Sequence, residues 1–158
     1  MKVIVDAREA YTHYPNLVVL ITSVDEGGQS NVMTGAWAMQ LGREPPLFGV
    51  AMRPSRYTYE LIGKTGEFVV NVPPSELQEA VKFCGENSGR DVDKFEKTEL
   101  TPVPARTVKA PWIEECVMHI ECKVKKMVEL GERVLVVGNV TGFYLDRDDY
   151  NRENLIFH

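Results

Sequence analysis

The sequence predicts a mainly β fold, a six-stranded antiparallel barrel with Greek-key connections and a few short helices. Three observations support this prediction. Runs of β-branched and apolar residues recur along the chain, and each is bounded by turn-forming residues. Short turns join several neighbouring runs, as in antiparallel hairpins, and the β-α-β alternation of a parallel sheet is absent. Gly138 and Gly142 lie inside the last run, where bends allow a small sheet to close.

The first three strands are predicted from apolar runs and their turns. Residues 17–24 form a continuous β-branched run, which is typical of a strand buried on both faces. The turn residues 25–28 end this strand, and residues 31–34 can pair back as the second arm of a hairpin. Residues 47–52 form the third strand, after two prolines that cannot lie inside a central ladder.

Two short helices and a fourth strand follow. The first helix is predicted over residues 57–62, with Gly63 placed to end it. Residues 67–72 form the fourth strand. Ser75 and Gln78 have the spacing of a capping box, which predicts an amphipathic helix that ends at Gly85. Cys84 lies on the apolar face of this helix and is therefore interpreted as a core residue.

The last part of the chain is predicted to hold a long loop and a hairpin. Residues 86–111 are irregular and polar, and a loop of that length is functional or lies at an interface. Residues 116–128 alternate between apolar and polar, which predicts a half-buried strand with His119 and Glu121 on its polar face. Residues 133–145 are its hairpin partner. His119 is interpreted as structural, because no metal-ligand spacing surrounds it.

Composition limits the class of protein. The 158 residues, 44% of them apolar and 26% charged, predict one soluble globular domain over residues 1–158. A net charge of −5 argues against non-specific nucleic-acid binding. No apolar run reaches the roughly 20 residues of a membrane span, and the N-terminus lacks the pattern of a signal peptide. The three cysteines form no C-x-x-C pair, so a cytoplasmic protein with reduced thiols is expected.

Residues 30–58 carry the densest set of ligand-binding side chains. Small residues and Trp37 come first, and two arginines, Arg53 and Arg56, then flank a turn with hydroxyl groups. Arginine, hydroxyls and a helix N-terminus bind phosphate, while Trp or Met can cover a flat ring. The stretch therefore predicts a site for a phosphorylated, partly apolar ligand. The same residues also fit an ordinary helix cap with a solvated arginine, so the residues alone leave both interpretations open.

No other catalytic or metal-binding pattern is present. The sequence has no G-x-G-x-x-G, no zinc spacing and no segment that assembles a Ser-His-Asp or paired-carboxylate site. We therefore predict no catalytic side chain and no metal site.

Seven sequence segments between about residues 15 and 145 follow one another in the order and spacing found in one protein family. They are Asn31-x-Met33-Thr34-x-x-Trp37, Pro45-Pro46-Leu47, residues 53–62, residues 66–73, residues 84–95, Leu100-Thr101-Pro102 and residues 110–116. In this order the chain resembles the flavin reductase-like proteins with an FMN-binding split barrel, a group that includes flavoredoxins and small ferric reductases. The resemblance implies a six-stranded Greek-key split barrel that forms a homodimer, with FMN near the subunit interface.

The resemblance also implies roles for individual residues. The FMN phosphate is expected at Ser55, Arg56 and Thr58, next to Tyr57, and Arg53 is expected to reach the phosphate or the polar edge of the flavin. The isoalloxazine ring is expected along a segment with small and aromatic residues, namely Asn31, Met33, Thr34, Ala36 and Trp37. Further expected contacts come from Asn71, for which a backbone carbonyl is the alternative partner, and from three loop residues, Ser88, Arg90 and Lys94, of the same or the second subunit.

The activity implied by the resemblance is that of an NAD(P)H-dependent flavin or ferric reductase. NADH or NADPH would reduce FMN, which would pass electrons to a small-molecule or protein acceptor, and the cofactor itself would supply the chemistry. Two alternatives stay open. One is a non-enzymatic FMN-binding protein for electron transfer or flavin storage, and the other is a barrel without flavin that serves in assembly.

Overall fold

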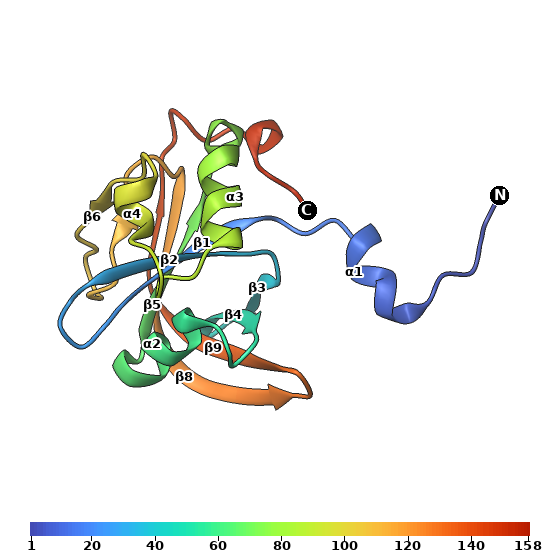
Figure 1. Cartoon of the computed structure of the whole chain (residues 1–158), viewed down its shortest axis with the longest axis horizontal. Helices are drawn as coiled ribbons and strands as arrows, with labels where there is room; N and C mark the ends of the chain where they lie inside the picture. Colours follow the sequence, from blue (N-terminus) through green and yellow to red (C-terminus); the bar gives the residue numbers. More distant parts are fainter.

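The computed structural model describes residues 1–158. Most of them form one curled antiparallel sheet or pack against it (Figure 1). Its seven strands run in the order β2-β1-β5-β8-β9-β4-β3. Their bounds are β1 Val19–Val24, β2 Ser30–Gly35, β3 Ala38–Arg43, β4 Pro46–Met52, β5 Glu67–Val72, β8 Met118–Leu130 and β9 Arg133–Leu145. A separate two-stranded ribbon joins β6 (Pro102–Val103) to β7 (Trp112–Ile113).

The sheet closes into a barrel that is split between β2 and β3. These two strands are the outer strands of the sheet, yet only Ala36 and Trp37 separate them in sequence. The two edges must therefore approach each other at this link, although no ladder of hydrogen bonds joins them. The N–H of Ala51 in β4 donates to the carbonyl of Trp37 at 2.9 Å and ties the link to the sheet. The predicted mainly β split barrel with short helices is confirmed.

The barrel sheet has one strand more than the six predicted, because β3 was not expected, and the separate ribbon of β6 and β7 was not expected either. The edge strand β3 has no buried face, since Met39, Gln40 and Leu41 are all exposed. It also contains a register shift between Gln40 and Gly42. Without alternating burial, its sequence carries no strand pattern of period two.

The core has two parts on opposite faces of the sheet. The larger cluster fills the barrel and includes Ile21, Phe68, Val70 and Val136. A Cβ atom at Gly138 would lie 2.9 Å from the Cζ of Phe68, so this position in β9 must be glycine for the barrel to pack. The smaller cluster packs helix α3 and residues 100–116 against the outer face of β1 and β2.

The first helix runs further than predicted. Helix α2 covers Tyr57–Thr65 and ends at Gly66, whose φ of 73° is the left-handed conformation of a helix C-cap. Gly63, the predicted end, lies inside the helix with nothing near it. A single glycine inside a helix costs about 1 kcal/mol relative to alanine, which packing on the sheet can offset.

The second helix begins later than predicted. Residues Ser75–Leu77 form the 3-10 helix η2, and helix α3 covers Gln78–Glu86. The predicted capping box is wrong, because neither η2 nor α3 has a side-chain cap at its N-terminus. Within residues 86–111, the short helix α4 (Lys94–Lys97) interrupts the predicted irregular loop.

The polar face of β8 is buried at His119 and Glu121, whereas Lys123 and Lys125 further along it are exposed as predicted. Residues 104–113 fold over it, so that Glu121 is fully buried and accepts hydrogen bonds from the N–H groups of Arg106 (2.8 Å) and Thr107 (2.7 Å). The indole Nε1 of Trp112 donates to the same carboxylate at 2.7 Å. Burial alone would raise the pKa of Glu121, but these hydrogen bonds outweigh it and hold the pKa below its ordinary value.

Asn71 belongs to the same buried network and not to a ligand site, which corrects the predicted FMN contact. Its side chain is fully buried, and its Nδ2 donates to the carbonyl of Leu20 at 3.1 Å. Its Oδ1 accepts from the N–H of Ile113 at 3.1 Å and lies 2.9 Å from Nδ1 of His119. These protein partners satisfy the amide, as the alternative interpretation of a backbone partner expected.

His119 should make the fold less stable in mild acid. It stacks on Trp112 with ring centroids 4.6 Å apart, and burial lowers its pKa from 6.5 to about 4. Between these values the unfolded chain binds a proton that the folded chain excludes, so stability falls by about 3 kcal/mol as the pH drops from 6.5 to 4. Urea unfolding at several pH values should show this loss in the natural chain and its absence in His119→Phe. An equal loss in both proteins would contradict the assignment.

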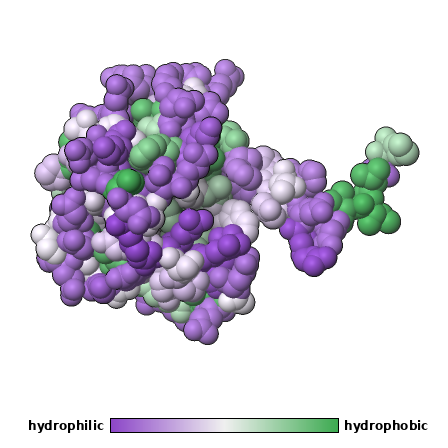
Figure 2. Space-filling view, viewed as in Figure 1, coloured by the Kyte–Doolittle hydropathy of each residue, from purple (hydrophilic) through white to green (hydrophobic).

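The N-terminal residues project from the barrel as an arm that carries the 3-10 helix η1 (Ala7–Glu9) and helix α1 (Ala10–His13) (Figure 1). The end of the arm is apolar and exposed, with Met1, Val3 and Ile4 each more than 70% accessible (Figure 2). The C-terminal residues, after the 3-10 helix η3 (Arg152–Asn154), return to the start of β1, where Phe157 bridges to Leu17. No helix has the length and apolar character needed to cross a membrane.

Candidate functional site

Two adjoining cavities lie along β2. The first, of about 480 Å³, is enclosed by β2, the start of α2 and residues 84–94, and is called the loop cavity here. The second, of about 720 Å³, lies where the barrel is split, and is called the split cavity. Met33, Thr34 and Arg56 line both cavities, so the two are neighbours along one surface.

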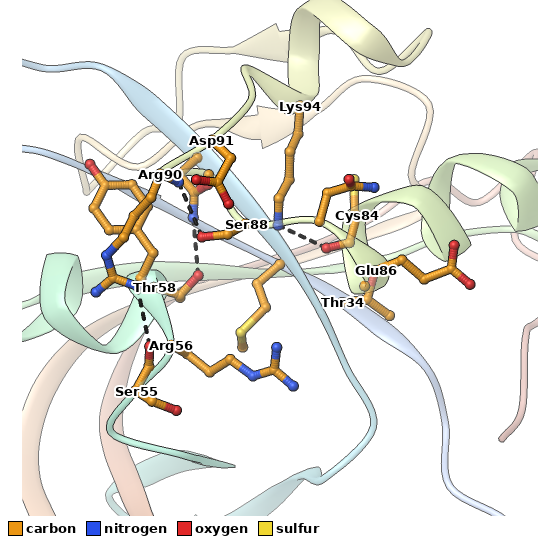
Figure 3. A pocket seen from close by; sticks show the side chains of 16 residues that line it. Thr34, Ser55, Arg56, Thr58, Cys84, Glu86, Ser88, Arg90, Asp91 and Lys94 are labelled. Atoms are coloured by element: carbon orange, nitrogen blue, oxygen red, sulfur yellow. Dashed lines mark hydrogen bonds between the residues drawn. The ribbon is translucent and has the colours of Figure 1, made fainter.

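The loop cavity is polar, and the corner between β4 and α2 forms one wall (Figure 3). Arg56 is the N-cap residue of α2 and provides no side-chain acceptor to the helix. The first N–H groups of an α-helix have no partner within the helix, so those of Tyr57 and Thr58 remain free to bind an anion. The Ser55 hydroxyl lines the same wall.

A buried hydrogen bond fixes the floor of the loop cavity. Nδ2 of Asn31 in β2 donates to Oγ1 of Thr58 at 3.0 Å, and both side chains are buried. The turn at Gly89 passes directly over them, because a Cβ atom there would lie 2.0 Å from Oδ1 of Asn31. Only glycine allows this close approach of the loop to β2.

Arg90 positions the loop and does not offer a free guanidinium. Its Nη1 donates to the carbonyl of Ser55 at 3.2 Å, and its Nη2 pairs with Glu60 at 2.8 Å. Its Cζ lies 5.1 Å from the centre of the Tyr57 ring. These contacts join the loop to the first turns of α2, so Arg90 holds the wall of the cavity in place.

Lys94 is a buried lysine at the base of the loop cavity, with a relative accessibility of 5%. Its Nζ donates to the carbonyl of Cys84 (Figure 3) and to that of Val32, at 2.8 Å each, and so joins β2 to α3. An ammonium has three protons, and the third remains available to a ligand. Burial lowers the pKa of Lys94, and Arg56 lowers it further.

Arg56 is the cation that is free at this site. It makes no ion pair and no side-chain hydrogen bond, and it lines both cavities. Figure 3 shows its guanidinium extending away from Ser55 into open space, with no dashed line to it. A guanidinium in this position can form the paired, charge-assisted hydrogen bonds that phosphate accepts.

The split cavity combines an apolar wall with arginines. Its wall includes the link between β2 and β3, with Ala36 and Trp37, and Met52 of β4. Arg53 and Arg133 line it from the ends of β4 and β9. Sequence analysis missed several of its residues, which are Arg8, Tyr11, Glu132, Arg133 and His158. They lie outside the recognised segments, and only the topology brings them here.

The structure brings together all the predicted site residues except Asn71. The loop cavity is lined by Asn31, Met33, Thr34, Ser55, Arg56, Tyr57, Thr58, Ser88, Arg90 and Lys94. The split cavity adds Ala36, Trp37 and Arg53. Sequence reasoning did not assign Cys84, Gly85, Glu86, Asn87, Gly89 and Asp91, which also line the loop cavity.

Neither thiol chemistry nor a metal centre is built into the site. Burial raises the pKa of Cys84 to about 11, so its thiol stays protonated at neutral pH and agrees with the predicted core role. No three His, Cys, Asp or Glu side chains are grouped so as to hold a metal ion.

Comparison with known proteins decides the family. Residues 11–158 match the family model described as a flavin reductase like domain. The chain belongs to the flavin reductase-like family. This agrees with the resemblance found in the sequence and assigns the chain to a family of flavin-binding oxidoreductases.

Relatives and solved structures of the flavin reductase-like family support this assignment. An uncharacterized protein of Archaeoglobus fulgidus is 46% identical over 127 residues, which cover 80% of this chain and 71% of the relative. Flavoredoxin of Desulfovibrio vulgaris (Miyazaki F) has a TM-score of 0.86 at 31% identity and covers 98% of this chain and 82% of its own. An FMN-binding protein from Thermus thermophilus with bound p-hydroxybenzaldehyde has a TM-score of 0.83 at 25% identity, over 96% and 84% of the two chains.

Proposed function

We propose that this protein binds FMN across the two cavities and acts as an NAD(P)H-dependent oxidoreductase that passes electrons to a small-molecule or protein acceptor. The observation that carries the proposal is the unpaired Arg56 at the junction of a polar cavity and a cavity with an aromatic wall. A phosphorylated ligand with a flat ring has this same division into a charged end and an apolar end.

The donors of the loop cavity fit the phosphate of FMN. Arg56, the hydroxyl of Ser55 and the first N–H groups of α2 all belong to the corner between β4 and α2 that forms one wall of this cavity. A helix N-terminus and a guanidinium together favour a dianion. Lys94 and Ser88 lie across the cavity, where they can donate to the ribityl chain or the phosphate.

The split cavity fits the isoalloxazine ring. Met33 and Trp37 offer surfaces for a ring face, and the small residues Gly35 and Ala36 allow backbone groups to reach its polar edge. Arg53 lies at the end of β4, within the same cavity. The protein would therefore hold the ring along β2 and leave one side of it open to a second substrate.

The chemistry would come from the cofactor. A bound FMN would supply the site for hydride transfer from NADH or NADPH and for the onward transfer of two electrons to the acceptor. The contribution of this chain is to bind the phosphate, orient the ring and place polar groups at its edge. No general acid or base is required from the protein, because the reacting atoms belong to the cofactor and its substrates.

We also propose a homodimer. Exposed apolar side chains support it, among them Val3 and Ile4 of the arm and Phe143 and Leu145 of β9. A second chain would bury these side chains and so gain roughly 25 cal/mol for each Å² removed from water. Sedimentation velocity that finds one chain per particle would contradict this proposal.

The function is tested by adding FMN to the purified protein, removing the excess and titrating anaerobically with NADH and then NADPH. We expect bound flavin absorption that bleaches faster than in a protein-free FMN control. Bound flavin that only dithionite reduces would favour the non-enzymatic alternative. Protein that retains no flavin would favour the assembly module and contradict the proposal.

A further inference from the structure

Arg133 has no assigned role in the proposed FMN site. It begins β9, and its Cζ lies 3.8 Å from the centre of the Trp37 ring, in contact with the wall of the split cavity. Stacking on the indole fixes where the guanidinium lies. Arg53 is its neighbour, because Met52 pairs with Val134 in the antiparallel ladder of β4 and β9.

The charges around Arg133 are not balanced. Its Nε is buried and has no hydrogen-bond partner, and the nearest carboxylate oxygen, from Glu132, is 3.7 Å away. The other oxygen of Glu132 lies 3.4 Å from Nη2 of Arg53. The carboxylate of Glu132 is therefore shared by the guanidiniums of Arg53 and Arg133, and Arg56 adds a third positive charge in the same cavity.

This positive cluster stands out in an acidic chain. The net charge of the protein is −5, yet the split cavity is lined by Arg53, Arg56 and Arg133 with Glu132 as the only acidic residue. Arg8 also lines the cavity but is paired with Asp6. Burial and the charges of Arg53 and Arg56 lower the pKa of Arg133. An anion bound here would relieve that repulsion and give Nε an acceptor.

The FMN phosphate is not expected to supply this anion, because its proposed donors lie in the loop cavity, which Arg56 lines but Arg53 and Arg133 do not. Whatever binds at Arg133 must be a second ligand that shares the split cavity with the flavin ring. A reduced nicotinamide nucleotide carries negative charge only on its phosphate-bearing tail. Its nicotinamide could face the ring while the tail lies against the guanidiniums.

We propose that Arg133, together with Arg53, binds the phosphate groups of the electron donor, a reduced nicotinamide dinucleotide, and so selects donors that carry an anionic tail. This inference rests on the proposed function and adds a specificity-determining residue to it. Arg133 contacts the donor and not the reacting atoms.

The test compares FMN-loaded natural protein with Arg133→Ala, Arg133→Lys and the control Arg43→Ala, which removes an exposed arginine from β3 outside both cavities. Calorimetry with ADP-ribose measures binding of the tail without electron transfer. Steady-state kinetics with NADH and with 1-methyl-1,4-dihydronicotinamide, which lacks phosphate, gives the preference for the charged donor as a ratio of kcat/KM values.

We expect Arg133→Ala to weaken ADP-ribose binding by about 10- to 100-fold and to reduce the preference for NADH by a similar factor, as loss of charge-assisted hydrogen bonds does. Arg133→Lys should fall between, since it keeps the charge and loses the fork. Arg43→Ala should match the natural protein, and added salt should weaken ADP-ribose binding in the natural protein more than in Arg133→Ala.

Unchanged ADP-ribose affinity in a folded Arg133→Ala protein would overturn the inference. An equal loss of kcat/KM with both donors in Arg133→Ala would also overturn the inference, and so would a loss of FMN affinity. Either result would mean that Arg133 supports FMN binding or the fold and does not bind the donor. If the natural protein binds no FMN, the proposed function fails. The ADP-ribose titration then still decides separately whether Arg133 binds the anion.

Discussion

Replacing Arg56 with alanine should weaken FMN binding by about 10- to 150-fold, the loss that follows from removing hydrogen bonds between charged groups worth roughly 1.5–3 kcal/mol. Arg56 is the guanidinium that both cavities share, and it has no partner within the protein. Its removal therefore leaves no buried acid unpaired and should not change the melting temperature. Fluorescence quenching of FMN on titration with protein measures the dissociation constant.

Two further variants sharpen this experiment. Arg56→Lys should recover part of the affinity, because an ammonium binds phosphate as a point charge without the bidentate geometry. Arg43→Ala lies outside both cavities and should bind FMN as the natural chain does. Unchanged FMN affinity in Arg56→Ala would contradict the assignment of the phosphate to the corner between β4 and α2. It would also contradict the proposed orientation of the cofactor, which depends on that assignment.

Glu121→Ala should destabilise the fold by about 3–5 kcal/mol, because four part-buried donors would lose their acceptor, each at a cost of up to roughly 1–3 kcal/mol. The donors are the N–H groups of Arg106 and Thr107, the hydroxyl of Thr107 and the indole of Trp112. Denaturant unfolding at pH 7 measures the loss. Glu129→Ala, at an exposed position on the same strand, is the matched control and should change stability by less than about 0.5 kcal/mol.

The same carboxylate predicts a pH dependence. Its pKa is held below the ordinary value of 4.5 in the folded chain. Its contribution is therefore fully present above pH 4.5 and is lost as the pH falls through the lowered pKa. The stability difference between the natural chain and Glu121→Ala should shrink over that interval. A difference that stays constant down to pH 2 would show that the carboxylate is not the group responsible.

The parts of the fold that sequence could predict are those where burial leaves a regular pattern. The hairpin partner 133–145 was placed with the bounds of β9, and residues 17–24 contain β1, because both are long apolar runs with clear turns. Strand β3 has exposed residues on both faces and left no pattern. The burial of His119 and Glu121 depends on residues 104–113, whose position over β8 is a long-range contact that no local rule describes.

The candidate site divides in a similar way. The residues around Arg56 follow one another along the chain, so their chemistry could be recognised as a group. Arg133 lies far from them in sequence and reaches the split cavity only through the register of β4 and β9. Asn71 was misassigned for the opposite reason. A polar residue in an apolar strand needs a partner, but the sequence does not say whether that partner is a ligand or the neighbouring backbone.

Lys94 has a consequence for how the proposed cofactor would be exchanged. Because its ammonium ties the carbonyls of Val32 and Cys84 together, β2 and the end of α3 keep their spacing without any ligand between them. The loss of conformational entropy that orders this wall therefore occurs when the chain folds, and it does not oppose the binding of the proposed cofactor. The ligand-free protein thus has a preformed cavity, and the proposed cofactor could leave and return without unfolding of the barrel.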